Sequence, residues 1–63
     1  MPDNQIANAA NLIRVATVYM ETLARFGRVA NTGSEADKKL ASSMIFYAWR
    51  DVRDAVAICD ADD

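Results

Sequence analysis

The sequence contains no histidine and a single cysteine, Cys59, among its 63 residues. One cysteine excludes a disulfide within the chain, and a structural zinc site normally needs several cysteine or histidine ligands. Without a histidine to act as its base, Cys59 lacks the usual activation of a catalytic thiol. We therefore expect Cys59 to pack as a core or seam residue, and we expect no metal site and no cofactor.

Glycine occurs only twice and proline once. The chain has no glycine-rich phosphate loop, paired-cysteine motif, zinc-protease motif or calcium-binding loop. An enzyme built as a helical bundle needs acids, bases or metal ligands that converge on inward faces. The residues that we expect to face inward are almost all apolar, so we expect no enzyme activity.

The net charge is also small, because seven Lys and Arg residues against nine Asp and Glu residues give a formal charge of −2. This balance argues against indiscriminate attraction to nucleic acid or to an anionic membrane. Polar residues interrupt the apolar stretch at 6–26, whereas a membrane-spanning helix needs about 20 mostly apolar residues. A lone thiol and the lack of an export signal favour a cytoplasmic location.

Large apolar side chains are few for a stable core. Of 33 apolar residues 12 are alanine, which leaves 21 larger ones. A chain of this length buries only about 60% of the surface that its unfolded form exposes, so a lone monomer would be marginally stable. Because disulfides and zinc are excluded, self-association is the remaining usual way to supplement the core.

The pattern predicts two helices, separated by the run Asn31-Thr32-Gly33-Ser34. Asp3 is the expected N-cap of a helix over residues 4–31, and Gly33 or Asn31 is expected to close it in the left-handed conformation. Ser34 with Asp37 resembles a capping box for a helix over 35–60. The short connection, at 31–34, forces the helices antiparallel, so the fold class is all-α: a helical hairpin that forms a single domain over 1–63.

The apolar arcs of both helices approach 180° on a helical wheel, wider than the stripe of about 100° that one neighbouring helix covers. The residues expected to face inward are, in the first helix, Ile6, Ala9, Leu12, Ile13, Ala16, Tyr19, Met20, Leu23, Phe26 and Ala30. Those of the second helix are Leu40, Ala41, Met44, Ile45, Tyr47, Ala48, Val52, Ala55, Val56, Ile58 and Cys59. Each helix needs two neighbours, which predicts a homodimer that forms an antiparallel four-helix bundle.

Alanine recurs at seven-residue spacing at Ala41, Ala48 and Ala55 in the second helix, and at 9, 16 and 30 in the first, where Leu23 occupies the intervening position. Small residues repeated in this way let antiparallel helices approach closely. Gly27 falls at the same angle as the alanines of the first helix, so we expect it to be a close-contact position as well.

Phe46 falls on the polar side of the second helix, with basic residues as near neighbours. An exposed aromatic ringed by arginines is typical of a protein-interface hot spot. The expected partner-binding residues are Phe46, Trp49, Arg50, Arg53 and Lys39. The alternative is that the second chain of the dimer covers Phe46.

Arg14, Arg25 and Arg28 share the outer face of the first helix, with Glu21 between them. They could contact an anion or a nucleic acid, or they could form an ordinary solvated face, since Glu21 and Arg25 have the spacing of a favourable helical ion pair. Asp51 lies near the apolar edge of the second helix, where a structural hydrogen bond or ion pair is a simpler role than acid catalysis.

The sequence therefore favours a small non-enzymatic protein-interaction module, a homodimeric adaptor or inhibitor that binds and modulates a larger protein. The second hypothesis is a regulatory four-helix bundle that binds RNA or DNA through paired arginine stripes.

Overall fold

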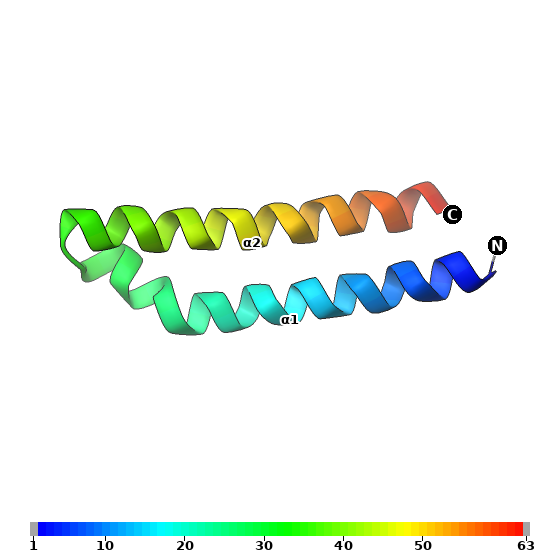
Figure 1. Ribbon diagram of the computed structural model, residues 1–63, viewed down its shortest axis with the longest axis horizontal. Coiled ribbons are helices and arrows are strands. Elements are labelled where there is room, and N and C mark those ends of the chain that lie inside the picture. Colours follow the sequence, from blue (N-terminus) through cyan, green and yellow to red (C-terminus); the bar gives the residue numbers. More distant parts are fainter. Residues whose placement is uncertain (1, 63) are drawn as a thin grey trace.

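The chain folds as two long antiparallel helices, which confirms the predicted helical hairpin. The computed structural model describes the backbone of residues 2–62 and the side chains of residues 4–61. Helix α1 spans Pro2–Thr32, and helix α2 spans Glu35–Asp62. The helices lie side by side in a rod of 48 × 16 × 11 Å, and the last turns of α1 bend toward α2 (Figure 1). No helix in the described part of the chain is long and apolar enough to cross a membrane.

The first helix begins two residues earlier than predicted, so Asp3 lies within α1 and is not its N-cap. Proline is favourable in the first turn of a helix because its fixed φ suits the helix and its missing N–H would have no partner there. The start at Pro2 is therefore consistent with the sequence, and the expectation that Asp3 caps the helix is wrong.

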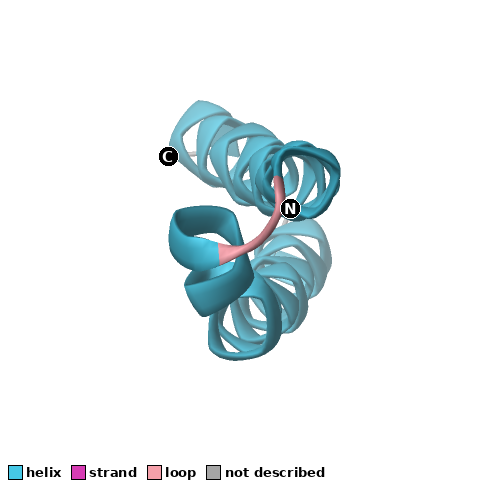
Figure 2. Cartoon of the chain, turned by 90° about the vertical axis from the view of Figure 1, so that its left-hand side faces the viewer, coloured by secondary structure: helices cyan, strands magenta, loops and turns pink. Residues whose placement is uncertain are grey.

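Two residues, Gly33 and Ser34, connect the helices (Figure 2). The Ser34 hydroxyl accepts a hydrogen bond from the Asp37 N–H at 3.3 Å, which confirms Ser34 as the cap of α2. Gly33 does not adopt the predicted left-handed conformation, and no described residue has a positive φ. Its role is steric, because a Cβ atom at position 33 would lie 2.8 Å from the Val29 carbonyl oxygen.

The helices meet along a row of residues spaced alternately by three and four, which is the spacing of a coiled-coil interface. We call this row the hairpin seam. All of its members are buried or half-buried. In α1 they are Asn8, Leu12, Val15, Tyr19, Thr22, Phe26 and Val29. In α2 they are Lys38, Ala41, Ile45, Ala48, Val52, Ala55 and Cys59.

Three alanines of α2 are the only buried positions among the described residues, with exposed fractions of 1% for Ala41, 8% for Ala48 and 3% for Ala55. This confirms that small residues bring the helices together on the α2 side. The alanine series of α1 lies outside the seam, and a Cβ atom at Gly27 would meet nothing within 4 Å. The hairpin alone therefore does not make position 27 a close contact.

The hairpin leaves two sides open. Because both helices are right-handed and antiparallel, the residues that follow seam positions by one share one side, and those that precede them share the other. The first side, which we call the apolar face, comprises Ala9, Ile13, Ala16, Met20, Leu23, Gly27 and Ala30 of α1, with Ile6 continuing the row, and Lys39, Ser42, Phe46, Trp49, Arg53, Val56 and Asp60 of α2.

The second side, which we call the charged face, comprises Ala7, Asn11, Arg14, Val18, Glu21, Arg25 and Arg28 of α1 and Asp37, Leu40, Met44, Tyr47, Asp51, Asp54 and Ile58 of α2. An open hollow of about 320 Å³ confirms that the two rows share one side, because Asn11 and Arg14 line it together with Asp51, Asp54 and Ile58.

The hairpin covers only part of the arcs that were predicted to face inward. Twelve large apolar side chains remain at least 40% exposed: Ile6, Ile13, Val18, Met20, Leu23, Leu40, Met44, Phe46, Tyr47, Trp49, Val56 and Ile58. Most of these were expected inside. They are exposed because each helix of the hairpin has only one helical neighbour. A single neighbour covers only one row of residues in an apolar arc that approaches 180°.

Candidate protein-binding surface

The middle of α2 carries an exposed cluster of three aromatic and two arginine side chains, which we call the aromatic–arginine cluster. Phe46 packs edge-on against Tyr47 with ring centroids 5.8 Å apart, and its centroid lies 6.0 Å from that of Trp49. The Arg50 guanidinium lies 5.2 Å from the centre of the Tyr47 ring, and that of Arg53 lies 5.3 Å from the centre of the Trp49 ring.

Helical spacing produces this arrangement, because residues three or four apart lie next to each other on a helix surface. Tyr47 with Arg50, and Phe46 with Trp49, are three apart, and Trp49 with Arg53 are four apart. Asp54 accepts hydrogen bonds from the Arg53 guanidinium, with an ion-pair distance of 3.2 Å. The cluster is therefore arranged by its own helix before any partner arrives.

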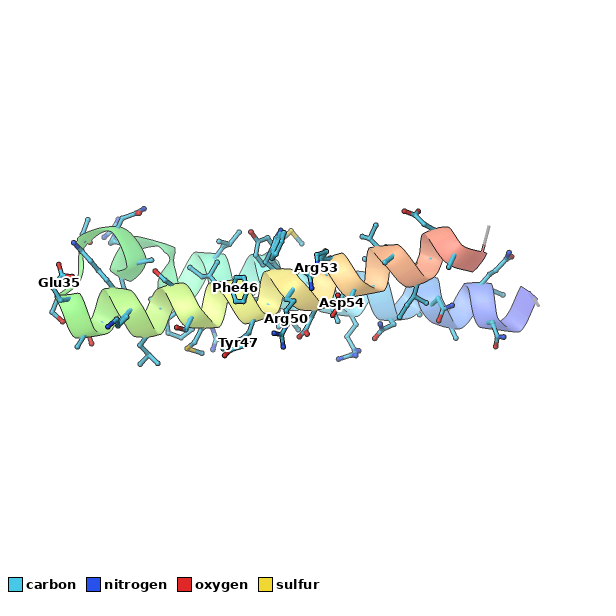
Figure 3. All side chains as sticks on the ribbon, turned by 90° about the horizontal axis from the view of Figure 1, so that it is seen from above. Glu35, Phe46, Tyr47, Arg50, Arg53 and Asp54 are labelled. Atoms are coloured by element: carbon cyan, nitrogen blue, oxygen red, sulfur yellow. The ribbon has the colours of Figure 1, made fainter. Side chains whose placement is uncertain are left out.

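The cluster wraps around the outer side of α2. In Figure 3, Tyr47 and Asp54 lie toward one side of the helix and Arg53 toward the other, with Phe46 and Arg50 between them. Tyr47 thus belongs to the charged face, Trp49 and Arg53 belong to the apolar face, and Arg50 points away from α1. The cluster can touch partners on two sides of the hairpin.

Four of the predicted partner-binding residues, Phe46, Trp49, Arg50 and Arg53, come together in this cluster and are exposed. Lys39 lies nearly two turns away, where it lines an open hollow of about 800 Å³ at the loop end of α2 together with Phe46 and Tyr47. Tyr47 was missed because it was expected to face inward. Its position, one residue before the seam residue Ala48, is the signal that could have placed it outside.

The three arginines of α1 are exposed and share the charged face, as predicted. Arg14 donates a hydrogen bond of 2.7 Å to the Asn11 side chain. It also lines the hollow that contains Asp51 and Asp54 of α2. Among the described residues, no ion pair holds Arg25 or Arg28. This row of three arginines therefore has no carboxylate paired with it at its loop end within the described residues, whereas Asp51 and Asp54 flank it at the other end.

The remaining polar candidates fit structural roles. Asp51 is exposed at the rim of the hollow that Arg14 lines. Cys59 is a free, half-buried thiol on the hairpin seam, which confirms its assignment as a packing residue. Within the described residues, no group of three or more His, Cys, Asp or Glu side chains is placed to hold a metal ion.

No family model, curated protein or solved structure matches the chain.

Proposed function

We propose that the chain is a small non-enzymatic protein-interaction module, a homodimeric adaptor or inhibitor that binds and modulates a larger protein in the cytoplasm. The observation that carries this proposal is the exposed aromatic–arginine cluster of α2. Trp, Tyr and Arg are the residue types that dominate the energy of protein interfaces. Here their side chains already stack on one another, so binding would cost little conformational entropy.

The chemistry of the cluster suggests the chemistry of its partner. Flat aromatic surfaces next to guanidinium groups fit an apolar pocket bordered by carboxylates, because buried apolar area then gains complementary charge at its rim. Phe46 is the member to test, since half of its surface is exposed and its ring contacts both Tyr47 and Trp49.

The test compares Phe46→Ala with Ile58→Ala, because the two side chains are equally exposed, at 50% and 49%, and lie on the same helix. Each purified variant is immobilised and used to capture proteins from cells of the source organism, with quantitative mass spectrometry as the measurement. We expect Phe46→Ala to reduce capture of a specific protein about 10-fold or more. Ile58→Ala should retain capture, and both variants should keep the helical circular dichroism of the parent.

Two results would contradict the proposal. If Phe46→Ala unfolds the chain, Phe46 is a core residue and not a contact residue. If both variants capture the same proteins as the parent, the cluster is not the binding surface.

Nucleic acid is the second candidate, supported by the open loop end of the arginine row at Arg25 and Arg28. Glu21 on the same face and the carboxylates beside Arg14 weaken an anion site there. Binding through phosphates should fall steeply with salt. A mobility shift with structured RNA at low ionic strength that weakens in Arg25→Gln and Arg28→Gln would favour this function over protein binding.

A further inference from the structure

We infer that the apolar face is the docking surface for a second copy of this chain, and that the two copies pack head to tail, with their loops at opposite ends. This rests on the proposed function only in the claim that the chain acts as a homodimer. It adds three things to that function: the face of the hairpin that contacts the second copy, the relative orientation of the two copies, and the part of the aromatic–arginine cluster that stays exposed.

The α1 half of the apolar face is a second coiled-coil row that has no partner in the hairpin. From Ile6 to Ala30 its members alternate in spacing by three and four, and none of them carries a charge. Such spacing is what a second, nearly parallel or antiparallel helix requires. From Ile6 to Met20 the row also alternates large side chains with alanines, which lets a facing helix approach closely.

The surface of the hairpin supports the same conclusion. Folded monomers of 6.9 kDa expose about 4,000 Å² by the usual scaling with mass. The hairpin exposes 4799 Å², an excess of about 800 Å². That excess is close to the area of about 800 Å² that each partner contributes to a stable interface of standard size.

The polarity of the two rows selects the orientation. If the loops lay at the same end, α1 would pack beside the α2 helix of the second copy, and Ile13 would face Arg53 while Ile6 would face Asp60. If the loops lie at opposite ends, α1 packs beside α1, and every position of its uncharged row meets an uncharged residue. The second arrangement leaves no charge facing the apolar side chains of the α1 row.

The α2 row is complementary to itself in this head-to-tail arrangement. Trp49 lies midway between Lys39 and Asp60, at the opposite ends of the row. A two-fold axis through the middle of the rod therefore brings the two Trp49 rings together and places Lys39 of each copy beside Asp60 of the other. The ends of the interface gain an ion pair, and its centre gains an aromatic contact.

Docking on the apolar face covers Trp49 and leaves Tyr47 and Arg50 free. Phe46 lies at the margin, because it points between the two sides of α2 (Figure 3). The dimer thus presents two copies of a Phe46, Tyr47 and Arg50 surface on its outside. These are the residues that remain for a larger protein.

The first test compares Ile13→Glu with Val18→Glu. Ile13 is on the apolar face and Val18 on the charged face of the same helix, and in the hairpin they are 69% and 47% exposed. The hairpin alone therefore predicts that Ile13→Glu is the milder change. Docking of a second copy predicts the reverse, since the new carboxylate would be buried without a partner, which raises the dissociation constant about 100-fold or more.

The measurements are sedimentation equilibrium of the purified protein and the fluorescence of Trp49, the single tryptophan. We expect the parent and Val18→Glu to have twice the mass of one chain and a blue-shifted emission, and Ile13→Glu to be a monomer with solvent-exposed emission. A monomeric parent, or equal loss of the dimer in both variants, would overturn the inference. Because no larger protein is present, either result is independent of the capture experiment.

The second test reads the orientation through disulfides in a Cys59→Ser background. Lys39→Cys and Asp60→Cys, both at exposed positions, are mixed as separate single-cysteine proteins and oxidised under mild conditions. Head-to-tail packing predicts a mixed disulfide in preference to two like ones, because positions 39 and 60 of one helix are about 30 Å apart. A dimer that forms no mixed disulfide would have its loops at the same end and would overturn the orientation.

Discussion

Alanine at positions 41, 48 and 55 sets how closely the two helices of the hairpin approach. Their methyl groups are nearly inaccessible to solvent, whereas every larger side chain on the seam stays partly exposed. A closely packed interface has no spare volume, so a larger residue there must push the helices apart or adopt a strained rotamer. The alanines are thus structural residues despite their small contribution to buried apolar area.

Ala48→Leu should destabilise the fold by about 1–3 kcal/mol, because it adds three carbon atoms to the middle of the seam. Ala57→Leu makes the same chemical change at an exposed position of α2 and should change the free energy of unfolding by less than about 0.5 kcal/mol. Urea denaturation followed by circular dichroism, at one protein concentration, measures both. Equal stability of the two variants would show that the seam is not tightly packed.

Gly33→Ala should also destabilise the fold, by about 1–3 kcal/mol, because its Cβ atom would lie 2.8 Å from the Val29 carbonyl oxygen and 3.3 Å from the Asp37 Cβ. Backbone atoms at the end of α1 would have to move to relieve this overlap. Asn31→Ala, at an exposed position two residues earlier, is the control and should be nearly neutral. Thermal melting of the two variants side by side distinguishes a steric role for Gly33 from a tolerant loop position.

At the scale of the elements, the boundary between the helices depends on Ser34. Its hydroxyl accepts a hydrogen bond from the Asp37 N–H, and its carbonyl accepts one of 2.8 Å from the Lys38 N–H. The first turn of a helix leaves backbone N–H groups without partners, and a capping side chain satisfies one of them. The two-residue connection therefore both ends α1 and begins α2.

Ser34→Ala should cost about 0.5–2 kcal/mol of stability, since it removes the capping oxygen while leaving the backbone intact. Ser43→Ala is the matched control, because Ser43 is exposed in the middle of α2, where alanine has the higher helix propensity. We expect the control to be unchanged or slightly more stable by urea denaturation. If Ser34→Ala is as stable as the control, Gly33 alone determines where the helices break.

The sequence predicted the helices, the break and the alanine contacts of α2, because each depends on local chemistry or on regular spacing. It did not predict which row of α1 faces α2. The row containing Leu12 and Tyr19 and the row containing Ile13 and Met20 are both apolar and have the same spacing. Hydrophobicity shows that both rows need cover, but it does not distinguish the neighbour within the chain from a neighbour in another chain. The seam also contains two polar residues, Asn8 and Thr22, which make this row harder to recognise from hydrophobicity.

At the scale of the whole molecule, the stability of the hairpin should depend on protein concentration. Its only buried described side chains are three alanines, and seven large apolar side chains of the apolar face remain open to solvent. Transfer of apolar surface from water contributes about 25 cal/mol per Å². Docking of a second copy would therefore add apolar burial that the hairpin alone lacks.

The melting temperature of the parent should rise steadily over about a hundredfold increase in protein concentration, because association that requires the folded state stabilises it by mass action. Ile13→Glu, which we expect to remain a single hairpin, should melt at a lower temperature that does not change with concentration. Circular dichroism at 222 nm measures both, with cells of different path length keeping the signal constant. A parent protein whose melting temperature is constant across this range would be a self-sufficient hairpin, and its apolar face would then be free for a partner other than a second copy.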